Sequence, residues 1–190
     1  PEQLAAAYRA ARDAGLDTEP AVVFHDLDRM RAAIADVRAA FPANALHTLA
    51  IKANPLVGVL QAAVAAGAGL EAATIEEVHL ALAAGCPPEH VVFDSPAKTL
   101  AELVDALRLG VRINCDSLAE VARIAALGLA PRAPIGLRIG PELAESALAL
   151  TSVGHRGSRF GVPLSERRAI LDAFARHDFL TGLHVHVGSQ

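Results

Sequence analysis

The side chain with the clearest chemical potential is Lys52, which ends a short apolar segment over residues 46–51 and precedes a turn. The alternation of this segment predicts a buried strand with Thr48, Ala50 and Lys52 on one face. A buried ammonium group without a partner is costly, so a lysine at this position needs a reason. One explanation is a structural ion pair. The other is a lysine kept uncharged and reactive, which forms an imine (a Schiff base) with an aldehyde.

Polar side chains also stand near the ends of three further apolar segments: Glu71, Arg138, and His184 with His186. The active site of a parallel barrel is built at the carboxyl ends of its strands, so we expect these groups to converge with Lys52 there. Gly69 and Gly136 stand two residues before Glu71 and Arg138. We expect these small neighbours to leave room for a ligand.

Together these groups suit a planar, phosphorylated aldehyde. Lys52 supplies the amine that forms the imine, and an imidazole can stack on a flat ring. The turn at Gly188-Ser189 offers backbone amides and a hydroxyl to phosphate oxygens. Pyridoxal 5′-phosphate (PLP) is the common cofactor with these features.

Each group also has a purely structural explanation. In that explanation Glu71 and Arg138 form an ion pair inside the barrel, and His184 is a core histidine with satisfied hydrogen bonds. His184 and His186 are two residues apart and could bind a metal ion. No third ligand stands at useful spacing in the sequence, so no metal site is expected.

The order of the predicted elements is strand, helix, strand, helix, and most helices end at a glycine. This order predicts parallel strands joined by right-handed crossovers. Counting from the strand at Lys52 gives about six βα units, against the eight of a closed barrel. The predicted fold class is therefore α/β, an incomplete N-terminal portion of a (β/α)8 TIM-type barrel. An open sheet of Rossmann-like order is the alternative, although no GxGxxG follows the first strand.

Three segments are expected along the chain. Residues 1–20 form an N-terminal helical segment, and residues 21–45 contain a strand at Ala21–Phe24 and a helix that lead into the barrel. Residues 46–190 form the partial, PLP-binding barrel. The connection over residues 141–160 is long, and we expect it to cover the mouth of the site.

Composition and charge narrow the class of partner. Of the 190 residues, 53% are hydrophobic and only 4% are aromatic, so aliphatic side chains must form the core. A net charge of −4 without a basic stripe makes nucleic acid and acidic membranes unexpected partners. Cys86 and Cys115 fit neither a CxxC metal motif nor a disulfide framework, which favours a reducing, cytoplasmic compartment. Lys98 and Glu102, one helical turn apart, are expected to form a solvated pair.

The stretch Leu49-Ala-Ile-Lys-Ala-Asn-Pro55 resembles the Tyr-Ala-x-Lys-Ala-Asn signature of the fold-type III PLP-dependent decarboxylases. This group contains the diaminopimelate, ornithine and arginine decarboxylases. Further matches follow in family order over residues 20–190: Gly69–Thr74 with Glu77, Phe93–Lys98, Asp116-Ser117 with Glu120, Leu137–Ile139, Ser158–Gly161 and Gly182–Gln190. The sequence departs from the family pattern at Leu49 (usually Tyr), Glu71 (Asp), Thr74 (Ser), Gly140 (Asn) and Arg159 (Lys).

The resemblance implies a role for each site residue. Lys52 would hold PLP as a Schiff base, and His186 would stack on the pyridine ring. Gly188 and Ser189 would contact the phosphate, while Glu71 and Arg138 would line the cofactor pocket. The strand at Ala21–Phe24 would belong to a second, β-rich domain.

The implied reaction is PLP-dependent decarboxylation of a basic or dicarboxylic amino acid, such as diaminopimelate, ornithine, lysine or arginine. An alanine-racemase-like activity is a rival, although Ala-Asn-Pro follows Lys52 where racemases carry Ala-Asn-Ala-Tyr-Gly. A non-catalytic PLP-binding or regulatory homologue is a second rival.

The resemblance also places several parts of the site beyond Gln190: a glycine-rich phosphate loop, an acid at the pyridine nitrogen, and a cysteine and a tyrosine from a second subunit. We therefore expect these residues to be part of a homodimeric enzyme. The rest of the polypeptide would supply the missing barrel strands and the β-rich domain.

Overall fold

The computed structural model describes residues 2–16, 18, 21–141 and 159–186. In these residues it contains one seven-stranded sheet whose strand pairs are all parallel. The strands are β1 (Thr48–Ala50), β2 (Gly69–Ala72), β3 (Val91–Phe93), β4 (Arg112–Cys115), β5 (Ile135–Gly140), β6 (Val162–Pro163) and β7 (Leu180–Val185).

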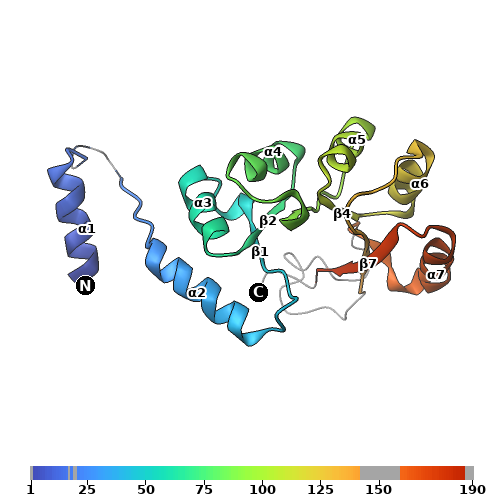
Figure 1. Cartoon of the computed structure of the whole chain (residues 1–190), viewed down its shortest axis with the longest axis horizontal. Helices are drawn as coiled ribbons and strands as arrows, with labels where there is room; N and C mark the ends of the chain where they lie inside the picture. The colour runs from blue at the N-terminus through green and yellow to red at the C-terminus, as the bar shows by residue number, and fades with distance from the viewer. Residues whose placement is uncertain (1, 17, 19–20, 142–158, 187–190) are drawn as a thin grey trace.

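The strands from β1 to β5 pair in sequence order, and β7 then pairs with β5. The two-residue strand β6 pairs only with the last residues of β5, Ile139 and Gly140. Figure 1 shows the helices from α3 to α7 along the outer side of the curved sheet. Sequential order with helices on one side is the architecture of a (β/α) barrel, whereas a Rossmann-like sheet reverses its order and carries helices on both faces. The barrel-type prediction is confirmed, and the Rossmann-like alternative is wrong.

Capping residues and glycines delimit the helices. The helices are α1 (Glu2–Asp13), α2 (Leu27–Ala40), α3 (Val57–Ala65), α4 (Ile75–Ala83), α5 (Leu100–Leu109), α6 (Leu118–Leu127) and α7 (Arg167–Arg176). The side chains of Thr74, Thr99 and Ser117 accept a hydrogen bond from a backbone amide in the first turn of α4, α5 and α6. Gly110 and Gly128 end α5 and α6 with φ of 77° and 61°, a conformation that favours glycine. Of the helices in the described part of the chain, none is long and apolar enough to span a bilayer.

The core lies between the sheet and these helices. Alternate strand residues are fully buried there, among them Leu70, Phe93, Ile113 and Leu137. The intervening residues of the same strands point to the concave face, as the period of two requires. The polar residues of the sheet lie on that face.

The strand expected at Ala21–Phe24 is not formed. These residues carry no sheet pairing, and Val23 is 77% exposed. An apolar run becomes a strand only where another strand offers its backbone groups, and no described strand lies beside this one.

The last strand also differs from expectation. The apolar alternation of residues 183–187 predicts a strand there, with Leu183 and Val185 packed against helices, but β7 runs from Leu180 to Val185. Leu183 and Val185 are 67% and 49% exposed, because no described helix covers this part of β7. The alternation itself holds, and the side chain of His184 is mostly buried.

Candidate active site

Polar side chains gather where the parallel strands end. Glu71 lies on β2, Asp94 and Asp116 follow β3 and β4, Arg138 lies on β5, and His184 lies on β7. Arg138 and His184 are paired in register on neighbouring strands. Carboxylate, guanidinium and imidazole groups therefore meet at the carboxyl edge of one sheet, which is where barrel enzymes build their sites.

Lys52 does not lie within a strand, contrary to expectation. β1 ends at Ala50, and Lys52 is exposed in the middle of a 3₁₀ turn over Ile51–Ala53. Ile51 takes the buried position instead, with no solvent exposure, and its carbonyl accepts a hydrogen bond from the Asn54 amide at 2.9 Å. The turn places the lysine at the carboxyl edge of the sheet and leaves its amine accessible.

Glu71 is the carboxylate beside this lysine. Burial raises the pKa of Glu71 above its usual value, while the charge of Lys52 lowers it. Asp94 and Glu77 raise the pKa further, and Arg138 lowers it slightly. The charges of Lys52 and Arg138 thus both act on the Glu71 carboxyl.

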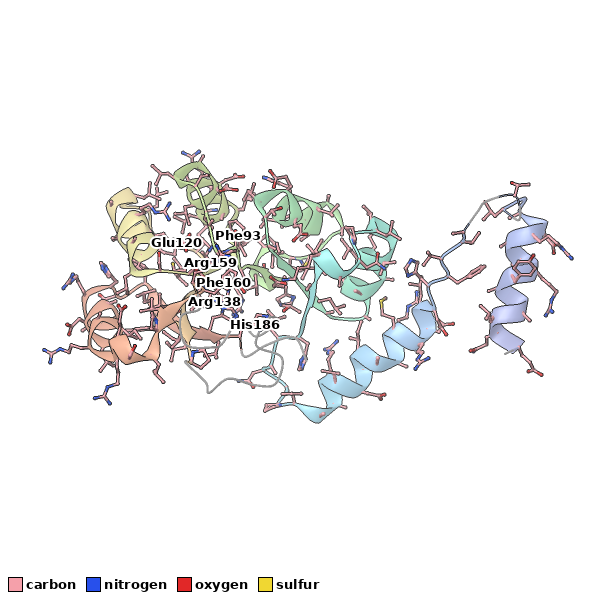
Figure 2. All side chains as sticks on the ribbon, turned by 180° about the vertical axis from the view of Figure 1, so that it is seen from behind. Phe93, Glu120, Arg138, Arg159, Phe160 and His186 are labelled. Atoms are coloured by element: carbon pink, nitrogen blue, oxygen red, sulfur yellow. The ribbon has the colours of Figure 1, made fainter. Side chains whose placement is uncertain are left out.

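Arg138 pairs with Asp116, and this replaces the ion pair with Glu71 considered from sequence. Its Nη1 lies 3.3 Å from Asp116 Oδ1, and both side chains are 8% exposed. Burial raises the pKa of Asp116, whereas a hydrogen bond from the Gly161 amide and the charge of Arg138 lower it. The guanidinium carbon also lies 5.0 Å from the centre of the Phe160 ring (Figure 2).

His184 is held against Asp94. Its Nδ1 lies 3.3 Å from Asp94 Oδ1, but the two groups are not aligned for a hydrogen bond among the described atoms. Burial lowers the pKa of His184, and the Asp94 carboxylate opposes that shift. His186, just after β7, is half-buried and acts on the charge of His184. Both histidines therefore belong to the same polar cluster.

Lys98 is buried, and the prediction of a solvated pair with Glu102 is wrong. Its Nζ donates to the carbonyls of Ser95 and Asn114, each at 2.6 Å, and to Glu120 Oε2 at 3.3 Å. Glu102 instead accepts the Thr99 amide in a capping box at the start of α5. Lys98 precedes that cap, so its side chain turns inward beneath the sheet edge.

The two glycines expected to leave room for a ligand make room for protein atoms. A Cβ at Gly136 would lie 2.5 Å from Asn114 Oδ1, so the Asn114 side chain occupies that space. A Cβ at Gly69 would clash with the carbonyl oxygen of His90. These glycines allow close strand packing.

Gly188 and Ser189 lie outside the described residues, as does most of the connection over 141–160. The expected phosphate contact and the expected cover therefore stay predictions. No group of three or more metal-ligating side chains occurs within the described ranges.

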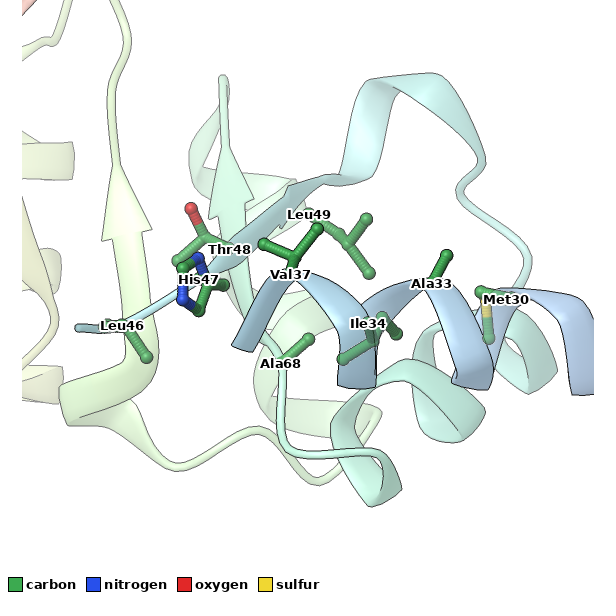
Figure 3. Close-up of a pocket in the computed structure, with 9 residues that line it drawn as sticks. All are labelled: Met30, Ala33, Ile34, Val37, Leu46, His47, Thr48, Leu49 and Ala68. Atoms are coloured by element: carbon green, nitrogen blue, oxygen red, sulfur yellow. The ribbon is translucent and has the colours of Figure 1, made fainter. Parts of the chain in front are cut away.

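An apolar groove lies elsewhere in the described part of the chain. It has a volume of about 440 Å³ and runs between α2 and β1 (Figure 3). The described residues that line it include no aspartate, glutamate, lysine or arginine: Met30, Ala33, Ile34, Val37, Leu46, His47, Thr48, Leu49 and Ala68. The groove offers little for catalysis, and the polar cluster is the candidate site.

Known proteins with similar sequences include diaminopimelate decarboxylases. A family model described as the pyridoxal-binding domain of pyridoxal-dependent decarboxylases matches residues 27–190. The diaminopimelate decarboxylase of Pseudomonas aeruginosa is 34% identical over 163 residues, which cover 83% of this chain and 39% of that protein. The diaminopimelate decarboxylase of Deinococcus radiodurans is 32% identical over 182 residues, or 95% of this chain and 46% of that protein.

Solved structures agree with these relatives. The crystal structure of Helicobacter pylori diaminopimelate decarboxylase complexed with L-lysine superposes with a TM-score of 0.76 at 28% identity. The superposition covers 87% of this chain and 44% of that one. The chain thus spans less than half the length of the curated relatives it matches. The family expected from the motif around Lys52 is confirmed, and the chain belongs to the pyridoxal-dependent decarboxylases.

Proposed function

We propose that this chain binds PLP through Lys52 and takes part in decarboxylating a basic or dicarboxylic amino acid. One observation carries the proposal. The chain has only two lysines, Lys52 and Lys98. Lys98 is fully buried, and each of its three N–H donors has an acceptor. Lys52 is exposed at the carboxyl edge of the sheet, so it is the lysine that an aldehyde can reach.

The residues around Lys52 fit the cofactor by their chemistry. The primary amine of Lys52 can take up the aldehyde carbon, and the half-buried His186 offers a flat ring. Arg138 supplies a fixed positive charge for an anionic group, because Asp116 and Phe160 hold its guanidinium. When bound, PLP supplies an electron sink for the pair of electrons left on the α-carbon as carbon dioxide departs.

Glu71 is the group best placed to handle a proton near Lys52. Because its pKa is raised, Glu71 keeps its proton to a higher pH than an ordinary glutamate does. The Glu71 carboxyl lies within electrostatic range of Lys52, and we assign it to give or take a proton when the amine of Lys52 loses or gains one. We assign Glu71 to proton exchange with the amine, and Arg138 and His186 to binding and orientation.

The substrate class follows from the relatives. Two relatives of the chain are named diaminopimelate decarboxylase, and one solved relative is complexed with L-lysine. We therefore propose that the substrate is a basic or dicarboxylic amino acid and that the active enzyme is a homodimer.

Release of carbon dioxide tests the proposed reaction. The protein that carries this chain is given PLP and, in turn, diaminopimelate, lysine, ornithine, arginine and alanine. We expect carbon dioxide from one of the first four, and none after Lys52→Ala. Racemised alanine without carbon dioxide would favour the racemase-like reaction, and PLP binding without any turnover would favour the non-catalytic homologue.

A further inference from the structure

The buried ion pair between Lys98 and Glu120 has no role in the proposed chemistry. The Lys98 side chain is 0% exposed and that of Glu120 is 2% exposed. Replacing such a pair by apolar groups is often neutral or stabilising, because both charges must lose their water shell. Stability alone is therefore a weak reason for this arrangement.

Lys98 joins three parts of the sheet edge. Its Nζ binds the Ser95 carbonyl after β3, the Asn114 carbonyl on β4, and the Glu120 carboxylate in the first turn of α6. Arg123 closes the cluster by donating from Nη1 to the Lys98 carbonyl at 2.8 Å. The cluster thus fixes the point where β4 turns into α6.

Asp116 is located at that point. Its backbone amide follows the last residue of β4 and donates to Glu120 Oε2 at 2.7 Å, the same oxygen that Lys98 binds. The Asp116 side chain then accepts from Arg138 Nη1 at 3.3 Å. The contacts run from Lys98 through Glu120 and Asp116 to Arg138.

Arg138 is also constrained from its other side. Phe160 lies beneath its guanidinium, and a Cβ at Gly161 would lie 3.0 Å from Arg138 Cγ. A buried guanidinium with so little free space takes its position from the carboxylate it binds. We expect a shift of the Asp116 backbone to move the guanidinium, because the 3.3 Å contact joins the two groups.

We infer that the buried Lys98–Glu120 pair is a positioning element for Arg138, acting through the backbone and carboxylate of Asp116. The inference rests on the proposed function only in giving Arg138 a cofactor to bind. Lys98 and Glu120 do not touch that cofactor. They fix the position of the Arg138 guanidinium, which would contact the cofactor.

The α4 unit provides a matched control. There the Ala73 amide donates to Glu77 Oε2 at 2.7 Å, with Thr74 as the helix cap. The geometry copies that of Asp116, Ser117 and Glu120, but Ala73 carries no charged side chain. Glu77→Leu should therefore cost stability without moving Arg138.

The decisive variant is Lys98→Met with Glu120→Leu, which removes both charges together. Its thermal midpoint should stay within about 5 °C of the parent chain. The amide of Asp116 should nevertheless exchange its hydrogen at least about tenfold faster, because it has lost its acceptor. The NMR resonance of Arg138 Nε–H should shift, and the Kd for PLP should rise about tenfold, as metal affinity falls when a group that orients a metal ligand is removed.

An unmoved Arg138 resonance and an unchanged PLP affinity in the folded double variant would show that the pair is structural only. If that variant does not fold, the Arg138 resonance is compared between the single variants Glu120→Gln and Glu120→Leu. Glutamine keeps an acceptor for the Asp116 amide and should hold the Arg138 resonance near its parent value, whereas leucine should shift it. Equal resonances in the two variants overturn the inference. The resonance is read without PLP, so a parent chain that fails to bind PLP defeats the proposed function and leaves this test intact.

Discussion

Asp94 Oδ1 lies 3.3 Å from His184 Nδ1, across the concave face from β3 to β7. Burial lowers the pKa of His184 below its ordinary 6.5, so the folded chain favours the neutral imidazole even with a carboxylate beside it. The relationship links pH to the stability of the site.

The contribution of His184 to the stability of the chain should fall as pH drops below about 6.5. In that window unfolded chains bind a proton at His184 and folded chains do not, so acid favours unfolding. Urea titrations between about pH 7 and pH 5 measure the effect. His184→Gln should flatten the dependence, and replacing the exposed His25 by glutamine should leave it in place. An equal slope in parent and His184→Gln would contradict this account.

Arg138→Met should destabilise the chain by about 3 kcal/mol, because it leaves Asp116 buried without its partner. Arg168→Met is the surface control. Arg168 also pairs with an aspartate, Asp172, but is 92% exposed, so its loss should cost less than about 0.5 kcal/mol. Urea denaturation measures the free energy of unfolding of both variants. Similar losses in the two would mean that the buried pair stabilises the chain no more than the surface pair does.

Gly161→Ala should combine backbone strain with a clash. Gly161 has φ of 75°, and its new Cβ would lie 3.0 Å from Arg138 O and Gly140 N. Gly85→Ala isolates the strain, since Gly85 has φ of 87° and nothing within 4 Å of a new Cβ. We expect about 1 kcal/mol for Gly85→Ala and at least about 1 kcal/mol more for Gly161→Ala. Equal losses would rule out close docking of Gly161 on Arg138.

Local sequence signals predicted most of the fold. The glycines after α5 and α6 and the Ser/Thr caps before α4 to α6 are short-range features, so they can be recognised in one chain without its partners. The prediction of a strand at Ala21–Phe24 was wrong, because a strand forms only beside another strand, which can be distant in sequence. The predicted first strand was too long, because a 3₁₀ turn follows β1 and buries the apolar Ile51 as a strand would.

The polar network was the least predictable part of the site. Lys98 was assigned by helical spacing to Glu102, whereas the capping box at Thr99 places it before α5. The Thr-x-x-Glu pattern was the signal that could have corrected this. The pairings of Lys98 with Glu120 and of Arg138 with Asp116 join residues that are 22 positions apart, and only the sheet brings them together.

Lys52 is the residue that we expect to receive the cofactor. The protein that carries this chain is mixed with PLP, reduced with borohydride and digested, and the pyridoxyl label is located by mass spectrometry. Since Lys52 is exposed and Lys98 fully buried, the account predicts the label on Lys52, none on Lys98, and none at all after Lys52→Arg. A label on Lys98, or no label on Lys52 in the protein that carries this chain, would contradict it.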